Sequence, residues 1–324
     1  MSVGPIAPTI IDTKDTKVTK RGDSPNKLSP KANFVLNLIL TLAMLACVLP
    51  LVIVISVSLS SESTILKEGY GLLPKDFTLD TYKFAFSDPR SIVNAYKVTI
   101  YTTIMATIIC LVNVSLFAYP LSRPDFKFRT EITFFMFFTM LFGGGLVAYY
   151  ILMTGFLGLR NSLWAIILPY SFNSFWVIVM RTFFRTQVPL SLIESARIDG
   201  AGEWRTFTQI VLPISLPGLA TVALFTTLGV WNDWFNCILF IDKPELANLN
   251  TLIYRALTSA RMLREIIATM GAAGSADAAA EIANLPNETF RMALAVITMG
   301  PIVLAYPFFQ KYFIRGLTVG SIKG

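Results

Sequence analysis

Six long apolar runs constrain the possible folds of this chain more than any other feature of its sequence. A helix needs about 20 mostly apolar residues to cross a membrane. Six stretches reach that length, at about 34–59, 95–120, 131–155, 163–182, 211–240 and 290–313. With 54% hydrophobic and 15% charged residues, the chain has too little polar surface for an ordinary soluble domain. The sequence therefore predicts an all-α polytopic membrane protein with six transmembrane helices, surrounded by membrane lipid.

The segment before the first run differs from the rest of the chain. Residues 1–32 are rich in Pro, Thr, Ser and Lys and have no apolar periodicity, so we expect them to be disordered. The run that follows is much longer than the apolar core of about 7–15 residues in a secretion signal, and we interpret it as a retained helix. Residues 33–324 are then expected to form one transmembrane domain.

The distribution of charge predicts which side of the membrane each loop faces. With the N-terminus placed inside, the loops and ends on that side hold 16 basic and 8 acidic residues, and the other side holds 11 of each. Basic residues concentrate in cytoplasmic loops. We therefore expect both termini and Lys127 in the cytoplasm, with Lys75 and Glu245 outside. The net charge of +7 follows from this topology and does not indicate a nucleic-acid partner.

The residue types that support catalysis or cofactor binding are missing from the sequence. The chain has no histidine, no G-x-x-x-x-G-K-[ST] phosphate loop and no G-x-S-x-G nucleophile motif. Its three cysteines, Cys47, Cys110 and Cys237, lie in apolar runs without paired spacing, and we interpret them as small core residues. We expect no catalytic site, metal or cofactor, so energy for any work must come from another subunit.

One charged stretch interrupts the apolar pattern on the predicted cytoplasmic side, between the fourth and fifth runs. It reads ESARIDGAGEWRTFTQIVLP, over residues 194–213. Pro189 and Ser191 resemble a helix start, and Glu194 stands at the capping-box spacing from Ser191. Gly200 occupies the position of a helix C-cap glycine. The stretch therefore predicts a helix that ends in a turn.

A second short helix is expected from Ala201 to Ile210, with Leu212-Pro213 leading into the fifth run. The resulting helix–turn–helix would present a surface of small residues, formed by Ser195, Ala196, Gly200 and Gly202. Small residues let another backbone approach closely, and the mixed charges suit a polar partner. An ordinary amphipathic connector explains the same pattern equally well on physical grounds alone.

The spacing of this stretch resembles the EAA loop of permeases in binding-protein-dependent ABC importers. That pattern is E-A-A, three residues, G, nine residues and I-x-L-P. Here Glu194-Ser195-Ala196, Gly200 and Ile210-Val211-Leu212-Pro213 match every spacing, with Ser195 in place of the first alanine. Three further segments resemble the maltose-type carbohydrate permeases: AYPLSRPDF (118–126), MRTFF (180–184) and WNDW (231–234). The tail, residues 306–324, resembles the branch of that family linked to larger or complex oligosaccharides.

The resemblance implies a type I ABC importer permease in a bacterial cell membrane, working by alternating access. Its implied partners are a homologous second permease, two cytoplasmic ATP-binding subunits, a lipid-anchored or periplasmic solute-binding protein and a carbohydrate substrate. Residues 189–213 would be the coupling loop, whose charges and small residues fit a socket in the ATPase. The implied coupling residues are Glu194, Ser195, Ala196, Asp199, Gly200 and Ala201. The alternative is a secondary transporter or a channel-like protein without an ATPase.

Asp233 is the outstanding candidate for a substrate path, because a carboxylate within an apolar run is costly and usually faces a cavity or a partner. Trp231, Asn232, Trp234 and Asn236 lie beside it. Aromatic faces, amides and carboxylates suit the C–H surfaces and hydroxyls of a sugar. The alternative is an aromatic belt at the membrane interface with one solvated acid.

A second candidate set combines Tyr149 and Tyr150 of the third run with Asn173 and Trp176 of the fourth. The two tyrosines follow three glycines, residues 143–145. Glycines in a membrane helix either permit close packing or break the helix where it lines a cavity.

Two polar, turn-rich segments, 60–93 and 241–289, are expected outside the membrane. The second includes an Ala-rich stretch from Met270 to Ala283. They are either solvated loops or, as the family resemblance implies, a docking surface for a solute-binding protein.

Overall fold

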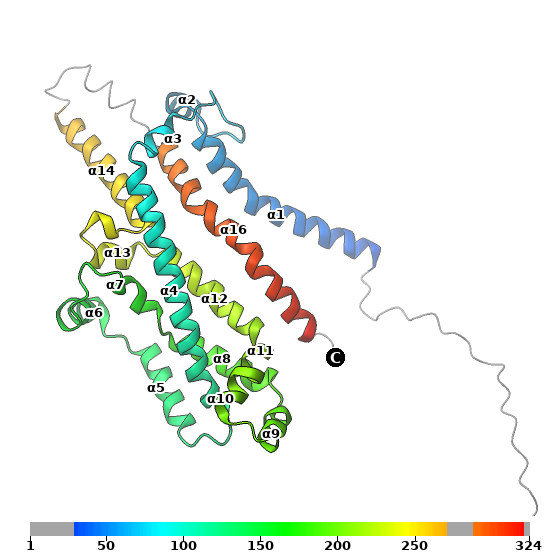
Figure 1. Ribbon diagram of the computed structural model, residues 1–324. Helices are drawn as coiled ribbons and strands as arrows, with labels where there is room; N and C mark the ends of the chain where they lie inside the picture. The colour runs from blue at the N-terminus through cyan, green and yellow to red at the C-terminus, as the bar shows by residue number, and fades with distance from the viewer. Residues whose placement is uncertain (1–28, 271–287, 321–324) are drawn as a thin grey trace, which may run out of the picture. The chain divides into compact units, whose positions relative to one another are not determined.

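The computed structural model describes residues 29–270 and 288–320, and the part of the chain it describes is helical, without a β-strand (Figure 1). The all-α prediction is therefore confirmed. The chain divides into two compact units, residues 1–51 and 52–324. α1 (Pro30–Ser58) begins in the first unit and is apolar over most of its length. Most of the segment predicted to be disordered, residues 1–28, lies outside the described residues.

Two described helices, α1 and α4 (Pro89–Ser122), are each long and apolar enough to cross a membrane. Three bent combinations qualify as single spans, which raises the total to as many as five in the described residues. They are α5 (Arg129–Leu141) with α6 (Gly145–Ile151) and η1 (Leu152–Phe156); α7 (Trp164–Ile167) and η2 (Leu168–Tyr170) with α8 (Ser174–Gln187); and α10 (Glu203–Thr206), η3 (Phe207–Val211) and α11 (Leu212–Ile214) with α12 (Leu216–Trp231). The sixth predicted run lies within α16 (Glu288–Gly320).

The third, fourth and fifth runs are thus not the continuous helices that the sequence predicts. α5 meets α6 at 109°, where Gly145 adopts a φ of +77° that side chains with a Cβ avoid. A Cβ on Gly143 or Gly145 would have no neighbour within 4 Å, so within this chain the triple glycine breaks the helix, and these two glycines are not sites of close packing. The bend of 76° before α12 precedes Pro217, which has no N–H to continue the helix ladder.

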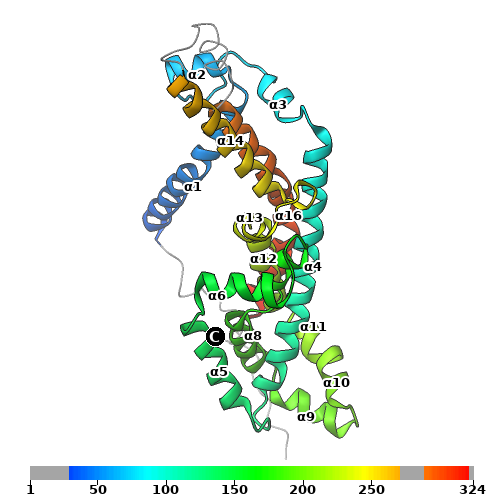
Figure 2. The same ribbon diagram turned by 90° about the vertical axis from the view of Figure 1, so that its left-hand side faces the viewer.

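The core of the second unit is built around α4, which packs against α8 and α12 (Figure 2). Buried side chains from the three helices form one apolar cluster, among them Cys110, Val114, Ala118, Val177, Met180 and Val222. α12 approaches α8 closely at Gly218, where a Cβ would lie 2.9 Å from the Phe183 ring. Cys110 and Cys237 are buried as predicted, whereas Cys47 is exposed. The same cluster continues into the loop after α8 through Ile193 and Phe207.

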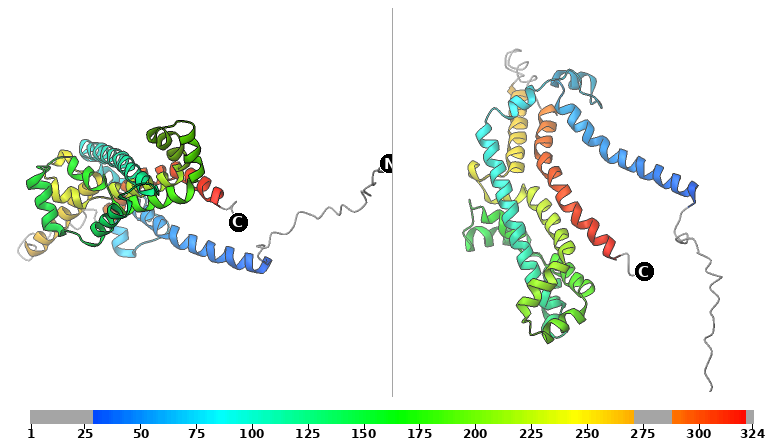
Figure 3. Two further views of the ribbon diagram at one scale, coloured as in Figure 1. Left: turned by 90° about the horizontal axis from the view of Figure 1, so that it is seen from below. Right: turned by 45° about the vertical axis from the view of Figure 1, so that its right-hand side comes forward.

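Both segments predicted to be outer loops contain helices. Segment 60–93 holds α2 (Glu62–Glu68), α3 (Asp80–Ala85) and the first turn of α4. Segment 241–289 holds η4 (Pro244–Leu246) and α14 (Leu249–Met270), while 271–287, with most of the Ala-rich stretch, lies outside the described residues. α14 packs beside α4 and α16 (Figure 3). These helices gather at one end of the second unit, and α9 (Leu190–Ile198) and α10 lie at the other (Figure 2).

Glu62 joins α2 to the N-terminus of α16. Its buried carboxylate accepts hydrogen bonds from the backbone N–H groups of Glu288 (3.0 Å) and Thr289 (2.9 Å) and from the Thr289 hydroxyl (2.7 Å). The first N–H groups of a helix have no partner within the helix and carry partial positive charge. The Glu62 carboxylate therefore supplies hydrogen-bond acceptors for the backbone N–H groups at the start of α16.

Candidate functional site

The candidate coupling loop folds into two short helices, and the first of them, α9, ends as predicted but begins differently. Pro189 precedes it and no side chain caps its start. Ser191 is already the second residue of the helix, so the predicted capping box with Glu194 is wrong. At the other end Gly200 has a φ of +77°, and the Ala201 N–H donates to the Ala196 carbonyl (2.9 Å). This pattern is a Schellman motif, which confirms Gly200 as the turn residue.

The second helix begins at Glu203, two residues later than expected. Gly202 is extended, and its carbonyl accepts the first helical hydrogen bond, from the Thr206 N–H (3.0 Å). Glu203 then occupies the first turn, where a negative charge is favoured by the helix dipole. The helix continues through η3 and α11 to Ile214. The predicted link between the loop and the fifth run is therefore a continuous helical path as far as the bend before α12.

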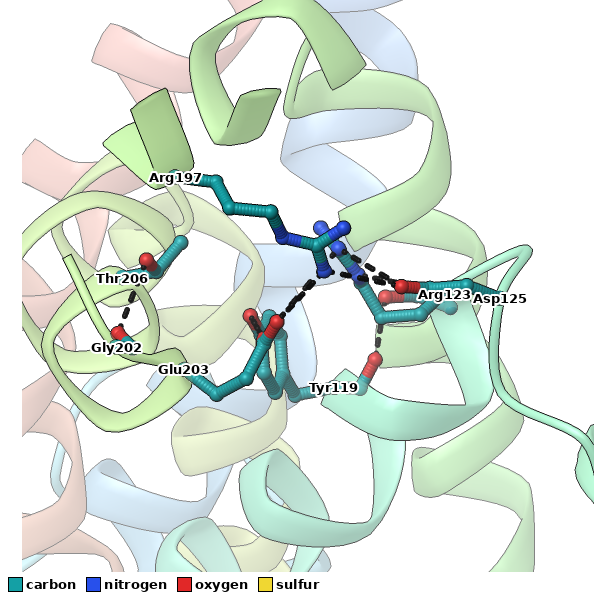
Figure 4. Close-up of polar contacts among 8 residues, drawn as sticks. Tyr119, Arg123, Asp125, Arg197, Gly202, Glu203 and Thr206 are labelled. Atoms are coloured by element: carbon teal, nitrogen blue, oxygen red, sulfur yellow. Dashed lines mark hydrogen bonds and ion pairs between the residues drawn. The ribbon is translucent and has the colours of Figure 1, made fainter. Parts of the chain in front are cut away.

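A polar network attaches both short helices to the end of α4 (Figure 4). Arg197 Nη2 in α9 donates to Asp125 Oδ2 (3.0 Å) and to Glu203 Oε1 (2.9 Å). Tyr119 of α4 donates its hydroxyl to Glu203 Oε2 (2.6 Å). Arg123, only 6% exposed, pairs with Asp125 at 3.3 Å. The five residues come from α4, the turn after it, α9 and α10, so the network holds these segments together.

Sequence reasoning missed this network. Arg197 and Glu203 were expected to contribute to a surface for a partner, but they bind each other and Asp125. The hydrogen bond from Arg197 is the main reason that the pKa of the Asp125 carboxyl lies below its usual value. The predicted topology carried a usable signal, because it placed AYPLSRPDF and the coupling loop on the same side of the membrane. Opposite charges in two such loops are candidates for pairing.

The surface that α9 and α10 leave free is partly small and partly apolar. Ser195, Gly200 and Gly202 are exposed, whereas Ala196 is only 7% exposed and packs inward, which corrects its expected place on the small-residue surface. Two large apolar side chains are also exposed, Ile198 at 86% and Trp204 at 68%. The free surface of the two short helices therefore includes apolar as well as small side chains.

The carboxylate of Asp233 is buried, with only 4% of the residue exposed, and lies between α12 and α13 (Phe235–Phe240). It accepts hydrogen bonds from the backbone N–H (3.0 Å) and the side-chain amide (2.9 Å) of Asn236. The Tyr149 hydroxyl donates to Asn236 Oδ1 (2.9 Å). Asp233 is therefore neither solvated nor unpaired. The structure brings Asp233, Asn236 and Tyr149 together in one polar group.

The other candidate path residues do not converge on this group. Trp231 is buried, and its indole N–H donates to the Thr298 carbonyl (3.2 Å). Trp234 is exposed and stacks on Tyr254, with 5.1 Å between ring centroids. Asn232 and Asn173 make local contacts, with the Leu228 carbonyl and the Phe175 N–H. Tyr150 stacks on the Phe240 ring, which also contacts Tyr149, and Trp176 stacks on the Phe225 ring. Within the described residues, no group of three or more His, Cys, Asp or Glu could hold a metal ion.

Helices long and apolar enough to cross a membrane, with a braced helix–turn–helix between two of the spans, define the class of this protein as a multi-pass membrane protein. Residues 91–319 match the family model described as binding-protein-dependent transport system inner membrane component. The chain belongs to this family and is a multi-pass permease of the ABC importer type.

Known relatives and a solved structure agree with this family. The polygalacturonan/rhamnogalacturonan transport system permease protein YtcP of Bacillus subtilis is 35% identical, with 86% of this chain and 94% of that protein aligned. The trehalose/maltose transport system permease protein MalG of Thermococcus litoralis is 32% identical over 86% and 92% of the two chains. A chain of a bacterial ABC transporter involved in the import of the acidic polysaccharide alginate matches with a TM-score of 0.72 and 25% identity, over 89% of this chain and 99% of that one.

Proposed function

We propose that this chain is the permease subunit of an ATP-driven importer that carries an oligosaccharide or another complex carbohydrate into the cytoplasm by alternating access. The relatives described above are named for the transport of carbohydrates, which supports this class of substrate. The observation that carries the proposal is the helix–turn–helix over 189–213, which has the EAA spacing and is braced against the end of α4. The bracing fixes the position of this loop relative to α4.

A separate ATPase would bind the exposed surface of α9 and the turn after it. Ser195, Gly200 and Ala201 would permit close approach of its backbone, and Ile198 and Trp204 would enter apolar contacts on it. Glu194 and Asp199 would supply polar contacts, because both are exposed and neither forms an ion pair with a described residue. Ala196 would act from inside, by holding the turn through its carbonyl.

Movement of the ATPase would reach the transmembrane helices by two routes. The first runs through Arg197 and Asp125 to the end of α4, and the second runs from Glu203 through η3 and α11 to the bend before α12. A homologous second permease would supply the other half of the pathway, and a second ATPase would bind its loop. Loops 60–93 and 241–289 would lie outside and meet the solute-binding protein.

The substrate path would pass the polar group of Asp233, Asn236 and Tyr149. In the present conformation Asp233 and Trp231 are buried, so they would act by positioning exposed groups such as Asn232 and Trp234, or after the helices move. The neighbouring aromatic rings suit contacts with the C–H faces of a sugar. The set Tyr150, Asn173 and Trp176 would line the pathway farther along.

The test of coupling is a comparison of Gly200→Arg with Gly200→Asn. Both variants place a side chain at a φ of +77°, which costs about 1 kcal/mol for most residues and less for asparagine. A Cβ at this position has no neighbour within 4 Å, so either side chain fits without a clash inside the chain. Only arginine adds a long, positively charged side chain to the surface. We expect Gly200→Arg to remain folded and inserted but to lose ATPase association and most carbohydrate uptake, and Gly200→Asn to keep both. Normal uptake and normal ATPase association by Gly200→Arg would refute the coupling role.

A further inference from the structure

A cavity of about 220 Å³ lies where the last turns of α4 and α8 meet the start of α5 and the first turn of α9. It is smaller than the pockets of about 300–1,000 Å³ that hold drug-sized molecules. Its walls are formed by Leu121, Ser122, Arg123, Pro124, Arg129, Arg181, Phe184, Arg185, Val188, Leu190 and Ile193. Four of these residues are arginines and none is acidic. The cavity therefore has a strongly positive wall on the side predicted to face the cytoplasm.

The protein itself leaves much of this positive charge unpaired. Arg123 pairs with Asp125 through Nε and Nη2 and lies 3.9 Å from Glu203, but its Nη1 is buried without a hydrogen-bond partner. Arg181 donates from Nε to the Leu121 carbonyl (3.0 Å), which is a neutral acceptor. Arg129 and Arg185 are exposed, and neither forms an ion pair with any residue in the described part of the chain.

An anion would resolve this arrangement. A buried donor without a partner is costly, and arginine presents planar pairs of N–H groups that match the oxygens of a phosphate. The cavity also has an apolar side, formed by Phe184, Val188 and Leu190. Basic pockets between helices at the cytoplasmic surface bind the head groups of anionic lipids. We propose that this cavity binds the phosphate of an anionic phospholipid at the cytoplasmic face of the membrane.

The cavity lies beside the coupling helix α9, so a bound phosphate would affect how this helix is held. Leu190 and Ile193 belong to α9, and Arg123 belongs to the network that fixes α9 to α4. A head group in the cavity would therefore touch the base of the coupling helix on the side away from its exposed surface. Anionic lipid would stabilise this end of the molecule whether or not an ATPase is bound. The proposal requires that the chain spans a membrane with this end at the cytoplasmic face, and it does not depend on the transported substrate.

Native mass spectrometry of the full chain in detergent tests the proposal. The probes are phosphatidylglycerol, phosphatidylcholine and inorganic phosphate, each added alone, followed by competition between the first and the last. The test variant is Arg129→Gln with Arg185→Gln, because both side chains are exposed and their replacement spares the core. The matched control is Arg205→Gln, an exposed arginine of α10 that bonds Gln209 (3.0 Å) and does not line the cavity.

We expect the parent and Arg205→Gln to retain phosphatidylglycerol in preference to phosphatidylcholine. The double variant should bind phosphatidylglycerol at least about tenfold more weakly, the loss expected for one hydrogen bond to a charged group. Displacement of the lipid by inorganic phosphate would support the phosphate site and identify free phosphate as a second source. Equal retention of phosphatidylglycerol by the parent and the double variant, with equal thermal unfolding profiles, would overturn the proposal.

Discussion

Several polar residues that the sequence presents as candidates for binding a ligand form hydrogen bonds with neighbouring side chains. Arg123 binds Asp125 through Nε and Nη2, and its Nη1 is buried without a hydrogen-bond partner. Asp233, which the sequence presents as an isolated acid, binds both amide groups of Asn236. Such pairings depend on how the chain leaves a helix, in the turn after α4 and in the break between α12 and α13. Sequence spacing identifies the residue types but does not specify these partners.

The role of Asp233 in transport is tested by two substitutions with different chemistry. Asp233→Asn keeps an acceptor for one of the two Asn236 donors and can still bond sugar hydroxyls, so we expect a smaller loss of uptake and of stability than in Asp233→Ala. Asp233→Ala removes the acceptor of both the backbone and the side-chain N–H of Asn236, at a cost of about 1–3 kcal/mol, and should lose most uptake. Uptake is measured per amount of folded protein in the membrane and compared with that of the parent. If normalised uptake is unchanged in both Asp233 variants, the residue is structural and lies off the substrate path.

At the scale of helices, the apolar runs predicted where the spans lie in the sequence but did not predict where the helices break within them. The first and second runs fall within the single helices α1 and α4, because nothing in them breaks the ladder strongly; Pro50 and Pro120 are tolerated inside. The third run breaks at its glycines, and the fifth breaks before Pro217 and again after Trp231. Hydropathy reports burial in lipid and is insensitive to such bends. Likewise α14, with polar residues on one side, was interpreted as part of a loop.

The contact between α2 and α16 gives a prediction at this scale. Glu62→Gln removes the charge and one acceptor oxygen from three donors at the start of α16, which should weaken this helix start by about 1–3 kcal/mol. Hydrogen–deuterium exchange should then become faster at the Glu288 and Thr289 amides. Glu68→Gln is the control, because Glu68 lies on the same helix, is exposed and pairs only with Lys75 in the described part of the chain. Unchanged exchange at both amides in Glu62→Gln would show that the carboxylate does not stabilise α16.

For the whole molecule, the orientation in the membrane remains our prediction from charge. α4 contains 34 residues, about 51 Å at helical rise, which exceeds the apolar thickness of about 30 Å. The segments at its two ends should therefore lie on opposite sides. The coupling loop is braced to the C-terminal end of α4, so that end must be cytoplasmic if an ATPase is to reach it.

Impermeant labelling of single cysteines tests this orientation, after Cys47, Cys110 and Cys237 are replaced by serine. Leu73→Cys, at an exposed position before α4, should react in intact cells. Lys127→Cys, at an exposed position just beyond its C-terminal end, should react only after the membrane is opened. Reaction of Lys127→Cys in intact cells would reverse the assignment.

The central claim is that this chain moves a carbohydrate with energy from ATP hydrolysed by a partner, and uptake into proteoliposomes tests it most directly. The vesicles would contain this chain, its partner permease and their ATPase, with the solute-binding protein and a labelled oligosaccharide outside. We predict uptake that requires hydrolysable ATP on the side of the coupling loop and is unaffected when ion gradients are collapsed. Uptake that proceeds without ATP and disappears when an ion gradient is collapsed would contradict the account and identify a secondary transporter.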